Sequence, residues 1–353
     1  MKLKNILFSL IMLVSMLFIG TANAETTAPS SYVIDGSKLH TIYGSSYLSG
    51  SQYIDIQFKK TTDGKIIYCI ERSKAPIGSG TTEKYTLQKE LSSKVAYVME
   101  NGYPNKSIFG NADKDYYTTG LAIWYVINPN DSTFEYFNLA NGTYRGNSSD
   151  IVVEMAKLVN GANSYSYTNP SIKINNSNSN LSLSSDGKYY VSSSMGVKTT
   201  GTVGNYTVSL SNAPEGTIVT DTKGNAKTTF ATNESFLVKV PVSNVKKISN
   251  EFQVNVSAKG TINKAYAYTS TRSNVQNTGA LYPENSNVND STTVKLNVVT
   301  VVEISKVDVT TGEELAGAHL ELKDEKGNLI EAWVSTNESH VIEGLAPGKY
   351  TLT

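Results

Sequence analysis

Cys69 is the only cysteine in this 353-residue chain, so no disulfide can join two parts of it. The fold must therefore be held by hydrophobic cores, and the length leaves room for two or three domains. A lone thiol in an exported chain is a buried apolar residue, half of an intermolecular bridge or a group with a chemical role. The residues that accompany Cys69 decide among these.

The N-terminus has the pattern of a secretory signal peptide. Basic residues precede an apolar run over 6–18, and Ala22-Asn23-Ala24 supplies the small residues that signal peptidase reads. The run is too short for a comfortable membrane span. We therefore expect a signal peptide over residues 1–24, a mature chain that begins at Glu25 and a secreted protein.

The charge balance argues against nucleic acid or an anionic membrane as the partner. Lys and Arg together number 31, as do Asp and Glu, and the signal segment removes two lysines and no acids, leaving 29 positive against 31 negative groups. The sequence also shows neither a phosphate-cradling glycine loop nor zinc-ligand spacing. We expect no cofactor and no metal.

The first region, over 25–167, is mixed in pattern. Short strand-like runs precede helical ones, and the apolar spacing predicts helices over 87–100, 115–127 and 149–159. Asn128-Pro129 should end the second of these helices, and the asparagine and glycine at 160–161 should end the third. This region is expected to be a mixed α+β domain.

The other two regions are expected to be β-structure. Residues 168–299 alternate apolar and polar positions between turns, as in 206–210, 236–240 and 252–256, which predicts an Ig-like antiparallel β-sandwich. Residues 300–353 begin a further β-rich region. The fold class is therefore multidomain and mainly β.

Two of these regions resemble known families. Tyr68-Cys69-Ile70-Glu71 and the run from Asp115 to Trp124 give the first region its resemblance to the thioester (TQxA) domain of Gram-positive surface adhesins. The element over 344–350, Gly-Leu-Ala-Pro-Gly-Lys-Tyr, makes 300–353 similar to the N-terminal part of a Cna B-type (SpaA-like) repeat. The region between resembles the sandwich that often follows a thioester domain.

The resemblance implies a chemical role for Cys69. In the family, a cysteine thiolate attacks a glutamine carboxamide, ammonia leaves, and an amine of a host protein later opens the resulting thioester. The motif match implies that the side chains around the cysteine form the thioester pocket; these are Tyr68, Thr119, Ala122 and Trp124.

The partner glutamine does not map onto this sequence. The TQxA pattern places it at position 120, where the chain has Gly120, and glycine has no side chain to acylate. Gly120 shares a helical face with Tyr116, Ile123 and Ile127, so the missing side chain is expected to point toward Cys69. The bond is expected to be absent, through natural variation or through engineering. Alternatively, another glutamine serves: Gln52, Gln57 or Gln88.

A cysteine hydrolase is the rival interpretation of Cys69, and it needs a histidine base. His319 and His340 lie in the third region, and the residues around His40 match no peptidase signature. We expect no enzymatic turnover.

Lys306 is the second residue of chemical interest. On a strand it shares a face with Val302 and Ile304, which would place its ammonium in the sandwich interior. Cna B-type repeats join such a lysine to an asparagine or aspartate, and both this partner and the assisting acid are expected beyond Thr353. The alternative is an edge lysine whose head group reaches water.

These features together predict a Gram-positive cell-surface adhesin with host surface or extracellular-matrix protein as its partner. Attachment to peptidoglycan or pilus subunits would depend on a sorting signal outside these residues. The alternative is a structural or non-covalent stalk or pilus-tip protein that retains the thioester fold without its chemistry.

Overall fold

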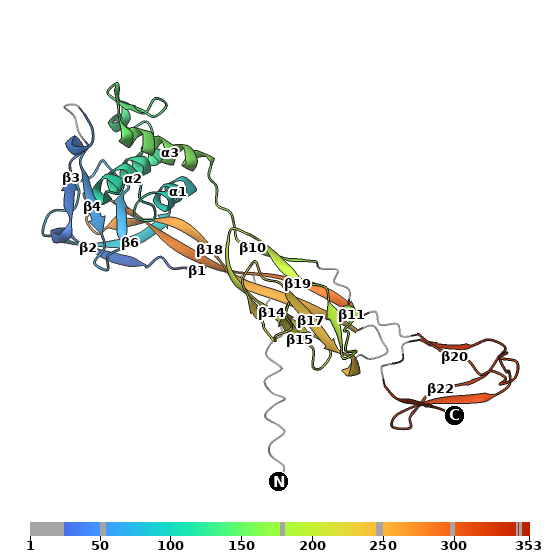
Figure 1. Ribbon diagram of the computed structural model, residues 1–353. Helices are drawn as coiled ribbons and strands as arrows, with labels where there is room; N and C mark the ends of the chain where they lie inside the picture. Colours follow the sequence, from blue (N-terminus) through green and yellow to red (C-terminus); the bar gives the residue numbers. More distant parts are fainter. Residues whose placement is uncertain are drawn as a thin grey trace, which may run out of the picture. The chain divides into compact units, whose positions relative to one another are not determined.

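The computed structural model describes residues 25–49, 54–176, 181–244, 250–296, 301–343, 345 and 348–353, so the predicted signal peptide lies outside it. The chain divides into two compact units (Figure 1). Unit 1 contains the residues up to Asn169 together with Thr261–Ser286, and unit 2 contains Pro170–Gly260 and Asn287–Thr353. Within the described ranges, no helix has the length and apolar character needed to cross a membrane.

Unit 1 is built on antiparallel strands in which neighbours come from distant parts of the sequence. The paired strands follow the order β18-β19-β5-β4-β3, and β6 pairs with both β18 and β2. The bounds are β1 (Glu25–Thr26), β2 (Ser31–Asp35), β3 (His40–Ile42), β4 (Ile56–Lys60), β5 (Ile66–Cys69), β6 (Thr82–Glu90), β18 (Asn250–Ser270) and β19 (Thr278–Leu296). A small ribbon adds β7 (Phe137–Asn138), β8 (Thr143–Tyr144) and β9 (Asn147–Ser148).

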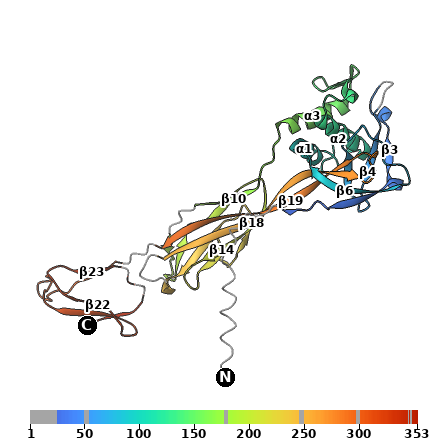
Figure 2. The same ribbon diagram turned by 180° about the vertical axis from the view of Figure 1, so that it is seen from behind.

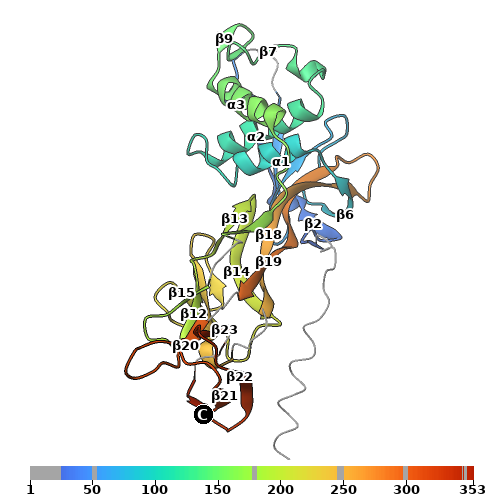
Figure 3. The same cartoon turned by 90° about the vertical axis from the view of Figure 1, so that its right-hand side faces the viewer.

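The α-helices of unit 1 are α1 (Ser93–Asn101), α2 (Ala112–Ile127) and α3 (Asp150–Ser164), which pack on one another (Figure 3). Short 3₁₀ turns occur at η1 (Gly36–Lys38), η2 (Gly44–Ser46) and η3 (Ser132–Phe134). Helix α2 starts at Asn111, whose side chain accepts a hydrogen bond from the Lys114 amide, and it ends before Asn128-Pro129 as predicted. Buried side chains of α2 face the strands and place the helix core against β4 and β5.

The predicted first helix is wrong in its first half. Residues 82–90 form strand β6, in which Glu83 and Tyr85 are buried and their neighbours exposed. Leu87 continues this period of two, although its spacing to Leu91 also fits a helix. Helix α1 begins only after Ser92.

The predicted end of the third helix is also wrong, because α3 continues through Asn160 and Gly161 to Ser164. A side chain at Gly161 would clash with the ring of Tyr97 on α1. The glycine therefore allows α1 and α3 to approach closely, and does not end the helix.

Strands β18 and β19 run side by side, and the boundary between the two units falls within both of them (Figure 2). Residues 261–286, which the sequence analysis placed in the β-sandwich, group with unit 1 in the structure. This segment carries the ends of the two strands and the connection between them into the first domain.

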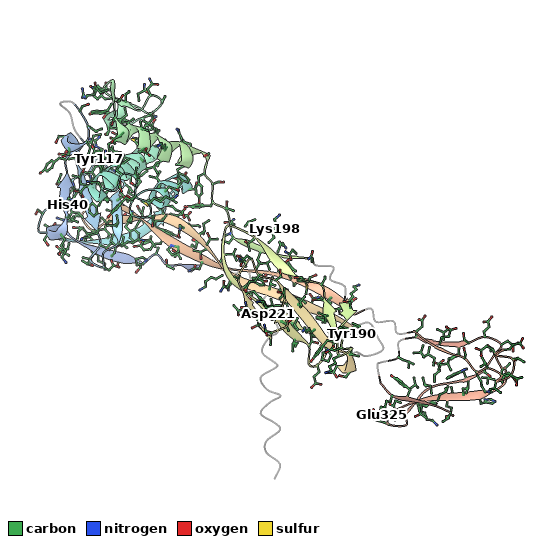
Figure 4. The ribbon with its side chains drawn as sticks, in the orientation of Figure 1. His40, Tyr117, Tyr190, Lys198, Asp221 and Glu325 are labelled. Carbon is green, nitrogen blue, oxygen red and sulfur yellow. The ribbon has the colours of Figure 1, made fainter. Side chains whose placement is uncertain are left out.

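Unit 2 holds the second hydrophobic core in antiparallel strands. Their bounds are β10 (Ser171–Asn175), β11 (Leu181–Leu183), β12 (Tyr189–Ser192), β13 (Gly196–Thr200), β14 (Thr202–Ser211), β15 (Ile218–Asp221), β16 (Thr229–Phe230) and β17 (Phe236–Pro241), followed by η4 (Val242–Asn244). Tyr206, Phe236 and Phe252 are among its fully buried side chains, and they lie in three of the runs predicted as strands. Figure 4 labels Tyr190, Lys198 and Asp221 in this part of the chain.

The last part of the chain is also antiparallel. Strand β20 (Val301–Ile304) pairs with β23 (His340–Glu343), and β21 (His319–Asp324) pairs with β22 (Leu329–Val334) and β24 (Tyr350–Leu352). Leu322, Ile342 and Leu345 form its small buried cluster.

Candidate functional site

Cys69 is the last residue of β5 and is buried, with 5% of its surface exposed. It lies opposite Thr278 of β19 in an antiparallel pair. The Sγ atom donates a weak 3.3 Å hydrogen bond to the carbonyl of Glu71, and Nε1 of Trp124 donates to the Cys69 carbonyl at 2.8 Å. The cysteine is thus held on both sides by residues of unit 1.

Gln276 lies beside this cysteine, two residues before Thr278, and is 8% exposed. Its backbone N–H donates to the Ala75 carbonyl at 2.9 Å, and its own carbonyl accepts a 3.1 Å bond from the hydroxyl of Tyr85. The following Asn277 carbonyl accepts from the Ile70 amide at 3.1 Å. These bonds fix the glutamine next to the strand end that carries Cys69.

Lys59 of β4 contacts Gln276 and interacts electrostatically with Cys69. Lys59 is only 1% exposed, and its ammonium donates a 3.4 Å hydrogen bond to Oε1 of Gln276. Burial lowers the pKa of Lys59, and negative charge on Cys69 opposes that change. Burial likewise raises the pKa of the Cys69 thiol, and the Lys59 ammonium opposes the rise. The three groups therefore share one buried environment.

Gly120 does not face this environment. A Cβ atom built at position 120 would lie 3.3 Å from Cδ1 of Ile56 and 3.8 Å from Cδ1 of Tyr68. The three nearest atoms to that position therefore belong to Ile56 and Tyr68, and none belongs to Cys69.

The predicted pocket residues are only partly brought together at the cysteine. Trp124 contacts it through the bond given above, and Tyr68 precedes it but turns toward α2, where its ring stacks on Tyr116 at 4.4 Å. Thr119 accepts a 3.0 Å bond from the Tyr103 amide and donates to the Asp115 carbonyl at 2.8 Å. Ala122 is a fully buried residue of the helix core.

The glutamines that the sequence analysis considered occupy other positions. Gln57 of β4 donates a 3.0 Å bond to the Ile77 carbonyl, and its Oε1 is buried without a hydrogen-bond partner among the described residues. Gln88 is exposed on β6, and Gln52 lies outside the described residues.

The sequence did not identify Gln276 as a site residue, because it lies within 168–299, the region predicted to form the β-sandwich. A signal was present: glutamine is rare in this chain, and Gln276 follows the valine of Ser-Asn-Val-Gln-Asn between two long strand patterns. Only the pairing of β19 with β5 connects that position with Cys69.

The histidines lie away from the cysteine. His40, labelled in Figure 4, bonds through Nε2 to Asp113 at 2.9 Å and stacks on Phe58 at 5.0 Å. His340 bonds to Glu331 at 3.1 Å and stacks on Trp333, in the last part of the chain. The structure thus offers no Cys–His contact among the described residues for a hydrolase. Nor do His, Cys, Asp and Glu side chains cluster there in groups that could hold a metal ion.

Lys306 is half-buried and lies two residues beyond Ile304, the end of β20, so the predicted strand placement is wrong by this short distance. Its backbone N–H donates to Oε2 of Glu314 at 3.0 Å. Lys306, Glu314 and Trp333 are among the residues that line a small pocket in this part of the chain.

A larger pocket of about 240 Å³ opens next to the cysteine. It is lined by the residues that directly follow Cys69, from Ile70 to Ser73, and by Trp124 and Asp131. Arg72 lies over the Trp124 ring and pairs with Asp131 at 3.5 Å. Cys69 itself does not line the pocket, but its neighbour Ile70 and its hydrogen-bond partner Trp124 do.

Two parts of the chain match protein-family models. Residues 66–170 match the model described as a thioester domain, and residues 300–353 match the SpaA model, described as a prealbumin-like fold domain. The chain contains a thioester domain. Both matches confirm the predicted resemblances and, with the strand-rich structure, the predicted multidomain and mainly β fold class.

Solved structures agree on the fold. The chain is similar to the TIE protein of Bacillus anthracis, with 23% identity and a TM-score of 0.64, over 94% of this chain and 59% of that one. It is also similar to the thioester domain of the Enterococcus faecium TIE86 protein, with 20% identity and a TM-score of 0.52, over 78% of this chain and 99% of that one. The chain thus spans less than two thirds of the Bacillus anthracis protein. No curated protein matches the chain.

Proposed function

We propose that the thioester domain forms an internal bond between Cys69 and Gln276 and uses it to capture a primary amine of another molecule. The observation that carries this proposal is the pairing of Cys69 with Thr278, two residues after the buried Gln276. This proposal replaces the expectation that Gly120 abolishes the bond.

The chemistry requires only the two side chains. The thiol of Cys69 adds to Cδ of Gln276 and ammonia leaves, which joins Sγ to Cδ as a thioester. A thioester lacks the resonance of an amide, so an amine opens it, forms an amide with Cδ and returns the thiol. The pocket beside Ile70 and Trp124 supports access of such an amine to the bond.

The proposed setting is the surface of a Gram-positive bacterium, where the protein acts as an adhesin after secretion. A covalent amide to a host surface or extracellular-matrix protein has no dissociation rate, which suits attachment under flow. The β-rich residues 168–353 serve as a stalk in this proposal. Anchoring to peptidoglycan or to pilus subunits would use segments outside this sequence.

Lys306 is proposed as the isopeptide lysine of the prealbumin-like domain. Its half-buried position in the small pocket of this domain supports this. The assisting acid and the asparagine or aspartate partner are still expected beyond Thr353.

Intact mass spectrometry of the purified mature chain tests the thioester. The wild type should weigh one ammonia less than its sequence, show no titratable thiol after unfolding without nucleophile, and gain one methylamine on treatment. Cys69→Ala and Gln276→Ala should each have the unmodified mass, whereas Gln57→Ala should keep the ammonia loss. An unmodified wild-type mass with a free thiol would instead identify a non-covalent stalk or tip protein, and loss of the bond in Gln57→Ala alone would make Gln57 the partner.

A further inference from the structure

Lys59 is a buried lysine without a carboxylate partner among the described residues. Its side chain is 1% exposed, and its hydrogen-bond acceptor there is the neutral amide oxygen of Gln276. An ammonium taken out of water loses several kcal/mol of hydration free energy, and buried lysines normally regain it from an acid. A lysine in this position is therefore poorly explained by stability alone.

Two tyrosine hydroxyls fix the backbones of Lys59 and Gln276. The hydroxyl of Tyr116 accepts a 3.2 Å bond from the Lys59 backbone N–H and donates to the Ile67 carbonyl at 2.7 Å, which ties β4 to β5 at the level of the site. Tyr85 donates to the backbone of Gln276 from the other side. The ammonium thus reaches the carboxamide of a glutamine whose backbone is fixed.

We propose that Lys59 is a catalytic residue for thioester formation, relaying the thiol proton to the leaving ammonia and stabilising the oxyanion at Oε1 of Gln276. The inference rests on the proposed Cys69–Gln276 bond and adds the group that drives it. A donor already aimed at the oxygen where negative charge develops is the usual source of such stabilisation.

The step balances with Lys59 unchanged. The neutral amine takes the proton from the Cys69 thiol, and the thiolate attacks Cδ of Gln276. The carbonyl electron pair moves to Oε1, where the new ammonium holds it. When the pair returns, the C–N bond breaks and the ammonium gives its proton to the leaving nitrogen. Thiol and carboxamide have then become thioester and ammonia.

The charge environment supports this exchange. Burial lowers the pKa of Lys59 and raises the pKa of Cys69, so the difference between the two pKa values becomes smaller. A smaller difference lowers the free energy needed to move a proton from one group to the other. Lys60, the next residue of β4, is exposed and has no such role.

The test starts from a reset protein. High concentrations of ammonia open the thioester to the original thiol and carboxamide, and removing the ammonia starts the reaction again. Intact mass against time then gives the rate for wild type, Lys59→Met, Lys59→Arg and the control Lys60→Met. We expect Lys59→Met to be about 100-fold slower, the size typical of a lost general acid–base or oxyanion donor. Lys60→Met should match wild type.

Lys59→Arg separates the two parts of the role. Arginine keeps the positive charge and the donors but does not release its proton, so it should retain part of the rate. Circular dichroism and thermal melting establish that each variant is folded. If Lys59→Met is poorly folded, Lys59→Arg carries the test, and a wild-type rate in folded Lys59→Arg would remove the proton relay.

A second measurement does not require the bond. In the Gln276→Ala background the thiol stays free, and its alkylation rate against pH gives its pKa. Adding Lys59→Met should raise that pKa, which a merely structural lysine would not do.

The outcomes separate the two proposals. A wild type that loses ammonia while Lys59→Met does so equally fast overturns the role of Lys59 and leaves the thioester intact. A wild type that never loses ammonia overturns the thioester itself and the role of Lys59 with it. An ammonia loss that leaves a titratable thiol would mean that Lys59 is joined to Gln276 as an amide, which makes the lysine a reactant and also overturns its catalytic role.

Discussion

Gly120 of α2 faces Tyr68 of β5, the neighbour of the cysteine, with 3.8 Å between the position of a Cβ at 120 and Cδ1 of Tyr68. Because the nearest atoms belong to Ile56 and Tyr68, a longer residue at 120 would enter the packing between α2 and the sheet. In the proposed Cys69–Gln276 bond, position 120 supplies neither reacting group.

Gly120→Gln should consequently destabilise the domain without changing the bond. Extra volume in this tightly packed layer is expected to lower the free energy of unfolding by about 1–3 kcal/mol. Denaturant unfolding measures that change, and intact mass should show the same ammonia loss as wild type. If only Gly120→Gln loses ammonia, position 120 is the site of the partner glutamine after all.

Gly120→Ala is the matched control. Its Cβ would meet Cδ1 of Ile56 at 3.3 Å, the end of a side chain that can shift, while alanine gains up to about 1 kcal/mol in helix propensity. We expect its stability to stay within about 1 kcal/mol of wild type.

Gly161→Ala should destabilise the domain, although helix propensity alone predicts that alanine stabilises it. The new methyl group would clash with the Tyr97 ring, so the free energy of unfolding is expected to fall by about 1–3 kcal/mol although alanine favours the helix. The same substitution in a Tyr97→Ala background should be neutral or stabilising. A double-mutant cycle measures the coupling, and additive effects would show that the two residues do not meet.

Local sequence patterns correctly predicted the helices and strands that have a single apolar period and a clear terminating residue. The apolar spacing and the Asn128-Pro129 stop predicted α2 and its end at Ile127, although the helix starts three residues before the predicted Asp115. Strict alternation predicted the strand around Tyr206. Where two periods overlapped, as from Leu87 to Leu91, the sequence could not decide. The buried Tyr85 on β6 shows that the period of two prevailed there.

The site was less predictable because it depends on contacts between distant segments. The motif around Cys69 identified the thiol, but Gln276 comes near this strand end through the pairing of β19 with β5, which no local pattern predicts. The helical face of Gly120 was correctly inferred as inward, yet which strand face it meets depends on the register of the sheet. Lys59 looked like an ordinary strand lysine, since nothing local distinguishes it from the exposed Lys60.

Tyr116→Phe should weaken both the fold and the reaction. The hydroxyl donates to the Ile67 carbonyl and accepts from the Lys59 amide, so its removal takes one hydrogen bond from each of two buried backbone groups. The free energy of unfolding is expected to fall by about 1–3 kcal/mol. After treatment with ammonia and its removal, the thioester should form again more slowly than in wild type, because the Lys59 backbone has lost its hydrogen bond to the Tyr116 hydroxyl.

Tyr117→Phe provides the comparison for Tyr116→Phe. Tyr117, labelled in Figure 4, is equally buried and donates one bond to the Ile54 carbonyl at 2.8 Å. It should lose about 1 kcal/mol of stability with an unchanged reaction rate. Equal slowing in both variants would mean that lost stability, and not the position of Lys59, controls the rate.

Glu83 anchors the segment that leads from β18 to Gln276. This buried carboxylate, on a side chain 2% exposed, accepts from Ser270 at 2.6 Å and Thr271 at 2.9 Å, and it pairs with the half-exposed Arg272. Burial tends to raise the pKa of Glu83, but these donors outweigh it and hold the pKa below the usual value. The folded state therefore favours the ionised group.

Acid should accordingly destabilise the domain through Glu83. A carboxyl whose pKa is depressed on folding contributes stability that is complete above the unfolded value of about 4.3, and the contribution is lost as pH falls through the folded value. Glu83→Gln removes that dependence, so its free energy of unfolding should vary less between pH 5 and pH 3 than that of wild type. At neutral pH the substitution weakens the buried hydrogen bonds of Glu83 and should lower the free energy of unfolding by about 1–3 kcal/mol. The ion pair with Arg272 adds little to this loss, because water screens the exposed side of the arginine. Glu135→Gln, at an exposed position of the same unit, is the control and should keep the wild-type pH profile. Parallel pH profiles for wild type and Glu83→Gln would show that the carboxylate is not what holds the Gln276 segment in place.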